Sequence, residues 1–300
     1  MSRAIPGPRA FSWIIPALLL AACAGSRGGP LPSGYTHTYD LKTGDVLRFE
    51  TLTTTTISSE MLDMVMPGGI EVRSPGVSRI DITGRTGENW TGDLTIEKFS
   101  LEGLEGMMAG LGGMLGDMDQ TGKRMPFTLE PNGRSSTKVD LGSGVSVPFG
   151  GEMMTAQGLG QFFIPWTDRP LTVGEAWTDS TTQEQELEGG VGISSTIVTH
   201  YTYLGLVEDE TGSGPLQTVQ AEMRGSMAGA VSSSAAGADM QMTIVGTWTG
   251  QTEYRFDPRD GLLVTSSGAM IMSMSMDMSV PMPMSIPVTM DMTISAKRIR

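Results

Sequence analysis

Residues 270–278 read Met-Ile-Met-Ser-Met-Ser-Met-Asp-Met, with a methionine at every even position. Because successive side chains of a β-strand point to opposite faces, this alternation predicts a strand with one apolar and one polar face. The pattern extends over residues 240–294, where apolar residues such as Trp248 and Phe256 again take even positions. At about 3.3 Å per residue this run is too long for one strand of a compact domain, so it predicts an antiparallel meander.

Turn-forming residues mark the two places where this meander doubles back. The first is Asp-Pro-Arg-Asp-Gly at residues 257–261, and the second is the proline-rich segment at 281–287. Shorter period-two stretches at residues 47–57, 80–82 and 197–203 extend the strand pattern along the chain. The sequence therefore predicts an all-β, antiparallel fold with two related β lobes, which form a sandwich or an open barrel.

One segment departs from the strand pattern. Apolar residues of segment 101–118 recur at steps of three and four, as on one stripe of a helix. Its glycines each cost a helix about 1 kcal/mol relative to alanine, so a stable isolated helix is not expected. We predict a mobile apolar flap or, alternatively, a short helix packed over the end of the sheet. The flap residues are Leu104, Met108, Leu111 and Met114.

The two halves of the chain share short strings at similar offsets. Residues 41–47 (Leu-Lys-Thr-Gly-Asp-Val-Leu) match residues 171–177 (Leu-Thr-Val-Gly-Glu-Ala-Trp), and residues 127–133 match residues 254–261. These matches predict an internal duplication, with convergent turn chemistry as the alternative. The predicted organisation is a signal peptide at 1–22, a lipidated flexible tether at 23–34, a first β repeat at 35–150, a connector at 151–168, and a second β repeat at 169–300 with a methionine-rich C-terminal hairpin.

The first residues have the layout of a secretory signal. Two arginines precede a short apolar stretch, which is about half as long as a membrane span and ends in small residues. The string Leu20-Ala21-Ala22-Cys23 resembles the lipobox of bacterial lipoproteins. This resemblance implies cleavage between Ala22 and Cys23, acylation of Cys23 and anchoring in a membrane. Ala24 stands where an inner-membrane retention signal would have Asp, which implies the outer membrane; a buried cysteine in an uncleaved segment is the alternative.

The body of the chain carries a second resemblance. The lipobox, the repeated Leu-x-x-Gly-acid strand openings and the string from Pro165 to Trp177 together resemble an uncharacterised family of two-repeat bacterial envelope lipoproteins. The resemblance implies an envelope location and an all-β body, and it implies no activity.

Composition excludes several classes of function. The 33 acidic and 20 basic residues give a formal net charge of −13, and no Lys/Arg cluster could neutralise a row of phosphates, which excludes nucleic acid as a partner. One Cys and two His exclude a disulfide scaffold and a Cys/His zinc site. His37 and His200 lie in strand-like stretches beside tyrosines, where hydrogen-bonded structural histidines are expected.

Signatures of catalysis and of metal binding are weak. The sequence has no Gly-x-Ser-x-Gly elbow, and nothing selects a pair of carboxylates for glycoside hydrolysis. Residues 117–122 imitate the first half of a calcium loop, but its twelfth position is Thr128 in place of the bidentate acid. We therefore predict no enzyme activity, no cofactor and no assigned metal site.

Methionine is the compositional anomaly of this chain, with 24 residues. The candidate site residues are Met270, Met272, Met274, Met276, Met278, Met282, Met284, Met290 and Met292. A face of unbranched, polarizable methionines can mould itself around a lipid or another apolar ligand. Its thioethers can also bind Cu(I), and a plain core for a structural or partner-docking protein is the third interpretation. We favour a non-enzymatic envelope lipoprotein, attached to the membrane through acylated Cys23, that binds an apolar ligand.

Overall fold

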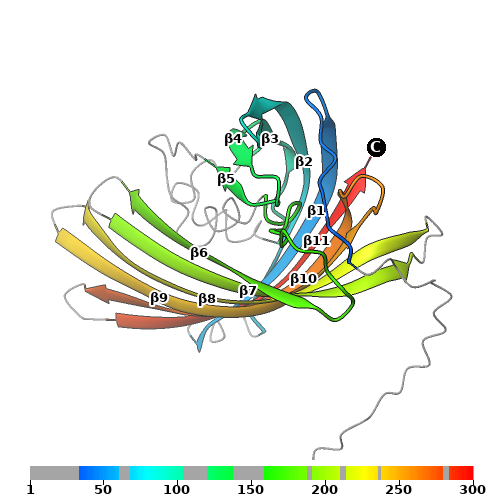
Figure 1. Cartoon of the computed structure of the whole chain (residues 1–300). Helices are drawn as coiled ribbons and strands as arrows, with labels where there is room; N and C mark the ends of the chain where they lie inside the picture. The colour runs from blue at the N-terminus through cyan, green and yellow to red at the C-terminus, as the bar shows by residue number, and fades with distance from the viewer. Residues whose placement is uncertain are drawn as a thin grey trace, which may run out of the picture. The chain divides into compact units, whose positions relative to one another are not determined.

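The computed structural model describes residues 34–60, 68–103, 120–137, 159–187, 191–209, 214–235, 238–279 and 284–299. The strands are β1 (Val46–Ser58), β2 (Ile70–Thr86), β3 (Asn89–Phe99), β4 (Arg124–Leu129), β5 (Ser135–Thr137), β6 (Ala176–Leu187), β7 (Val191–Glu208), β8 (Pro215–Ala235), β9 (Ala238–Phe256), β10 (Leu263–Ser279) and β11 (Met284–Ile299). They form one antiparallel sheet in the order β5-β4-β3-β2-β1-β11-β10-β9-β8-β7-β6 (Figure 1). The predicted all-β antiparallel fold is confirmed.

The pairing of β1 with β11 joins the two halves of the chain. Their register runs from Arg48 opposite Ile299 to Ser58 opposite Thr289. Strands β2 to β5 extend the sheet on one side of this pair, and strands β10 to β6 extend it on the other. The sheet is open, with β5 and β6 as its edges, and both predicted repeats lie in it.

The strand openings at the start of the two halves have the same turn structure. Gly44 and Gly174 both adopt a positive φ, at 95° and 86°, which only glycine tolerates well. The acid that follows each glycine accepts a hydrogen bond from a backbone N–H three residues earlier: Asp45 from Lys42 and Glu175 from Thr172. The internal duplication stays a prediction, since equal turn chemistry accounts for this match as well.

The sheet is curved (Figure 1), and side chains on its inner face are more buried than those on its outer face. Along β10 the described even-numbered side chains from Met270 to Met276 are buried, whereas Ser273 and Asp277 at odd positions are exposed. Val245 and Ile271 are exposed apolar exceptions on the outer face. The period of two predicted for the meander is therefore the alternation between these two faces.

Candidate functional site

One end of the inner face carries a surface that we call the methionine cluster. Its buried members are Ile244, Trp248, Met270, Met272, Met274, Met276, Val288 and Met290. Ile57 of β1, Ile197 of β7 and Met227 of β8 pack against its margins, so the cluster extends across the sheet from β1 to β7. The Trp248 indole ring lies directly over Gly225 of β8. A Cβ at Gly225 would therefore overlap the ring.

Most of the described methionines of the predicted site lie in this cluster. Those at positions 270, 272, 274, 276 and 290 have exposed fractions between 1% and 7%, and Met292 is partly buried against them. Met284, at the start of β11, is 43% exposed. The remaining predicted residues lie outside the described part of the chain: Met282 and the side chain of Met278, Leu104, Met108, Leu111 and Met114 of the flap, and Ala22 and Cys23.

Two rows in which every side chain except that of Ile294 is small or polar separate the methionine cluster from the other end of the inner face. They are Ser74-Thr53-Ile294-Gly268-Thr252 and Gly76-Thr51-Ala296-Ser266. Within them Thr53, Ser74 and Ser266 are buried, with exposed fractions of 8%, 8% and 6%. These rows divide the interior into two apolar regions of different composition.

The other apolar region, which we call the aromatic cluster, is filled by the chain itself. Its strand residues include Phe49, Ile80, Trp90, Phe127, Tyr201, Tyr203, Tyr254 and Phe256. The segment 159–171, which connects the two halves, contributes Leu159, Phe162, Phe163, Ile164, Trp166 and Leu171 to the same core. Phe162 stacks on Phe49 with ring centroids 4.3 Å apart. The sequence predicted a connector at residues 151–168 and the start of the second repeat at residues 169–171, and it did not predict that this segment is part of the core.

A hydrogen-bond network fixes the segment 159–171 in place. The buried Tyr39 hydroxyl donates to the Ile164 carbonyl oxygen at 2.9 Å. It accepts hydrogen bonds from the Ile164 N–H at 2.9 Å and from the Trp166 indole N–H at 3.1 Å. Burial raises the pKa of Tyr39, so the hydroxyl stays protonated and its donor and acceptor sites are occupied.

His37 is a buried structural residue of the aromatic cluster. Its ring stacks on Trp166 with centroids 3.8 Å apart, and Nδ1 donates to Gln217 Oε1 at 3.3 Å. Burial lowers the pKa of His37 to about 3, although the Gln217 side chain and the Gly261 backbone act in the opposite direction. Its Nε2 lacks a hydrogen-bond partner within the described residues. A neutral, enclosed imidazole of this kind is no general base for a solvent-borne substrate.

The edges of the open sheet are tied together at the aromatic end. Arg134, in the turn between β4 and β5, forms an ion pair with Asp179 of edge strand β6. The backbone N–H of Trp166 donates to the Asn132 carbonyl oxygen, and the indole N–H of Trp177, on β6, donates to the Pro165 carbonyl oxygen. Both hydrogen bonds are 2.7 Å long. The segment 159–171 therefore links β6 to the β4–β5 turn.

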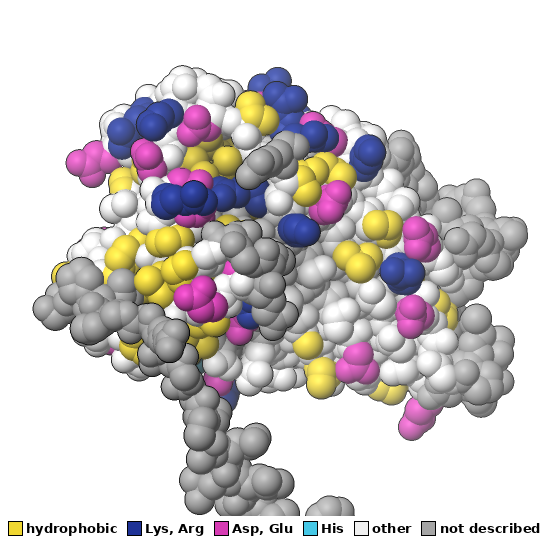
Figure 2. Space-filling view, turned by 90° about the vertical axis from the view of Figure 1, so that its right-hand side faces the viewer, with side chains coloured by type: hydrophobic (Ala, Val, Ile, Leu, Met, Phe, Trp, Pro, Cys, Tyr) yellow, Lys and Arg dark blue, Asp and Glu magenta, His cyan; other side chains and the backbone are white. Residues whose placement is uncertain are grey.

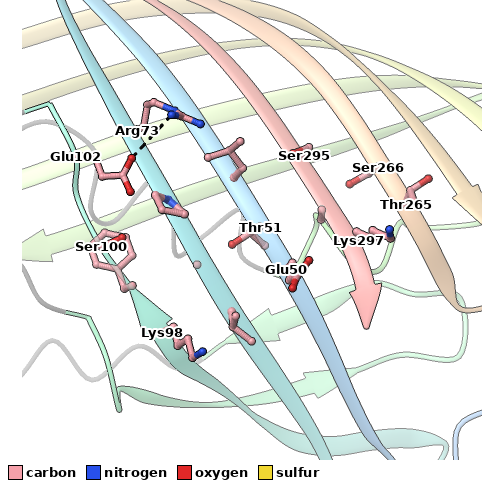
Figure 3. A pocket seen from close by; sticks show the side chains of 16 residues that line it. Glu50, Thr51, Arg73, Lys98, Ser100, Glu102, Thr265, Ser266, Ser295 and Lys297 are labelled. Atoms are coloured by element: carbon pink, nitrogen blue, oxygen red, sulfur yellow. Dashed lines mark ion pairs between the residues drawn. The ribbon is translucent and has the colours of Figure 1, made fainter. Parts of the chain in front are cut away.

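A groove of about 950 Å³ hollows the outer face where β1, β2, β3, β10 and β11 meet (Figure 3). Pro75 lines the groove, and the register of β2 with β3 shifts nearby, between Val77 and Ser78. Proline and a bulge both bend a strand, which accounts for the hollow. The Arg73–Glu102 ion pair lies on its rim.

Figure 2 shows Lys and Arg side chains gathered toward the top of the molecule, with Asp and Glu among them.

His200 belongs to a polar row on the outer face. Its Nδ1 lies 2.8 Å from the Thr178 hydroxyl, and Glu222 is its register partner on β8. A hydroxyl, an imidazole and a carboxylate are the components of a nucleophilic triad. His200, Thr178 and Glu222 all lie on an exposed face, where water competes for their hydrogen bonds.

Two further findings concern metals and membranes. Within the described ranges, no three His, Cys, Asp or Glu side chains are grouped so that they could hold a metal ion. Among the described residues, no helix is long and apolar enough to cross a bilayer.

Comparisons with known proteins return distant solved structures. No family model matches the chain, and no curated protein matches it. Neisserial surface protein A has 7% identity and a TM-score of 0.22 over 85% of this chain and 97% of that one. The outer membrane protein opdK from Pseudomonas aeruginosa has 6% identity and a TM-score of 0.26 over 85% and 99%. OccAB3 from Acinetobacter baumannii has 8% identity and a TM-score of 0.25 over 85% of this chain and 100% of that one. TM-scores this low establish no common fold, so function has to be inferred from the residues of this chain.

Proposed function

We propose that this protein is a non-enzymatic, lipid-anchored binding protein of the cell envelope, and that it holds an acyl chain or a similar apolar ligand at the methionine cluster. The observation that carries the proposal is the composition of this cluster, in which one inner-face surface presents five buried methionines. Their unbranched side chains adapt to irregular partners at little cost. The aromatic cluster differs in kind, because the segment 159–171 packs its rings and aliphatic side chains against those of the strands.

An acyl chain suits this surface on energetic grounds. Each methylene group that leaves water contributes about 0.8 kcal/mol, so even a partly buried chain gains several kcal/mol. A flexible chain also needs a wall that can repack around several conformations. Methionine side chains with three rotatable bonds meet that need better than the stacked rings around Phe49 and Phe162.

The location belongs to the same proposal. The lipobox Leu20-Ala21-Ala22-Cys23 supports acylation of Cys23, and Ala24 supports retention at the periplasmic side of the outer membrane. Ion pairs on the outer face, such as Arg48–Glu97 and Arg124–Asp93, fit a body that lies in water beside its anchor.

The test is native mass spectrometry of the protein, purified without detergent and challenged with palmitate. We expect the wild type to retain one palmitate and the variant Met274→Gln/Met276→Gln to lose it. Met125→Gln is the matched control, because Met125 is a buried methionine of the aromatic cluster. Circular dichroism checks that each variant is folded. Equal palmitate retention in folded Met274→Gln/Met276→Gln and in the wild type would contradict the proposal.

A further inference from the structure

Four methionines of the inner face form a two-by-two array across β10 and β11. Met270 lies opposite Met292, and Met272 lies opposite Met290. Three of them are buried, at 4%, 1% and 6% exposed for Met270, Met272 and Met290, and Met292 is partly buried. The array therefore places four thioether groups on one face, two on each of two paired strands.

The spacing of the array allows the four sulfurs to meet. Directly opposed residues of an antiparallel pair have Cβ atoms about 5 Å apart. Residues two positions apart along a strand are separated by about 7 Å. A methionine side chain has three rotatable bonds, so four of them can turn toward a shared centre. Gly250 is the register partner of Met270 on β9, where a Cβ would crowd the Ala269 carbonyl oxygen and the Met270 Cβ.

The described residues that flank the array in the sheet are uncharged. Gly250 and Thr55 flank the Met270–Met292 pair, and Trp248 and Ile57 flank the Met272–Met290 pair. Hard divalent cations such as Mg²⁺ and Ca²⁺ need oxygen ligands and carboxylates, which these two rows do not supply. Neutral thioethers are soft ligands, and among biological metals they select Cu(I).

We propose that Met270, Met272, Met290 and Met292 bind one Cu(I) ion through their thioether sulfurs. This site goes beyond the proposed acyl-chain function and does not depend on it, because it requires four specific sulfurs and not a general apolar surface. Partly buried Met292 gives the ion its access from solvent.

The adjacent positions of β10 supply a matched control. Met274 and Met276 lie on the same face but oppose Val288 and Ile286, so neither has a methionine partner. Replacing methionine by leucine keeps the volume and removes the sulfur, at a cost below about 1.5 kcal/mol in stability. The variants Met272→Leu/Met290→Leu and Met274→Leu/Met276→Leu therefore differ in whether they remove half of the array.

The experiment is an anaerobic titration of the full chain with Cu(I) against a chromophoric Cu(I) chelator. We expect one Cu(I) per chain, an affinity reduced at least tenfold in Met272→Leu/Met290→Leu, and an unchanged affinity in Met274→Leu/Met276→Leu. Thermal unfolding verifies the fold, and the single variant Met292→Leu replaces the double variant if the latter does not fold. Absence of wild-type binding, or equal loss in both double variants, would overturn the proposal. Palmitate retention is measured on the same variants without copper. The two measurements test Cu(I) binding and acyl-chain binding independently of each other.

Discussion

The two ends of the inner face both bury apolar side chains, but they differ in the kind of packing. At the aromatic end, rings stack in defined pairs such as Phe49–Phe162 and His37–Trp166. The Tyr39 hydroxyl also holds the segment 159–171 by three hydrogen bonds. At the other end, methionines line the face without directional contacts among the described residues.

This difference assigns separate roles to the two ends. Stacked rings and saturated hydrogen bonds specify one arrangement, so the aromatic end holds the halves of the chain together. Methionines tolerate several arrangements at similar energy, and the proposed function therefore assigns ligand binding to the methionine end. If the aromatic end is rigid and the methionine end adaptable, matched substitutions at the two ends should differ in their cost to stability.

The largest expected effect is that of Gly133→Ala at the aromatic end. Gly133 has a φ of 92°, and a Cβ there would overlap the Ile164 carbonyl oxygen. Backbone strain and overlap together predict a loss of about 4 kcal/mol in the free energy of unfolding, measured in urea. Gly225→Ala, whose Cβ would meet the Trp248 ring at the methionine end, should cost less than about 2 kcal/mol. An equal cost at both sites would remove the contrast in rigidity.

Next in size is Tyr39→Phe, which removes a hydroxyl with three hydrogen bonds. Leaving the Ile164 and Trp166 polar groups unpaired predicts a loss of about 3 kcal/mol. Tyr203→Phe is the control, because the buried Tyr203 hydroxyl has no hydrogen-bond partner among the described residues. We expect that change to be neutral or slightly stabilising in the same urea titration, and a large loss there would contradict the assignment.

A pH dependence should arise from His37. Its pKa in the folded state is about 3, below the ordinary value of 6.5, so the unfolded chain binds the extra proton first as pH falls. His37 therefore makes its full contribution to the free energy of unfolding above pH 6.5. This contribution declines as the pH falls from 6.5 toward 3, and at pH 5 it is lower by about 2 kcal/mol. In His37→Phe, unfolding titrations between pH 6.5 and 5 should lose this slope; an unchanged slope would assign it to other groups.

The smallest expected effect is that of a volume-conserving swap. Met272→Leu should change the free energy of unfolding by less than about 0.5 kcal/mol, because flexible neighbours repack around the new side chain. Met125→Leu makes the same change among the rings of the aromatic cluster and should cost about 1 kcal/mol. Thermal unfolding of the two variants compares them directly, and the reverse order of costs would argue against an adaptable methionine end.

Local patterns made much of this fold predictable. The methionine alternation at residues 270–276 predicted the strand and its buried face, and Asp-Pro-Arg-Asp-Gly at 257–261 predicted the turn between β9 and β10. Both signals are local, because side-chain alternation and turn chemistry depend on neighbouring residues.

Non-local features were not predictable in the same way. The pairing of β1 with β11 joins residues near the two ends of the chain, and no short-range pattern encodes such a pairing. Segment 159–171 owes its burial to partners such as Phe49 and Tyr39 that are distant in sequence. The two-by-two methionine array likewise depends on the register of β10 with β11, which alternation alone leaves open.

The most direct test of an adaptable, ligand-accepting methionine end is tryptophan quenching by dibromostearate, since bromine quenches only nearby indoles. Trp248 lies in the methionine cluster, and Trp90 lies in the aromatic cluster. We predict saturable quenching of the wild-type protein that Trp90→Phe retains and Trp248→Phe loses. Quenching that survives in Trp248→Phe and disappears in Trp90→Phe would place the acyl chain at the wrong end and contradict the account.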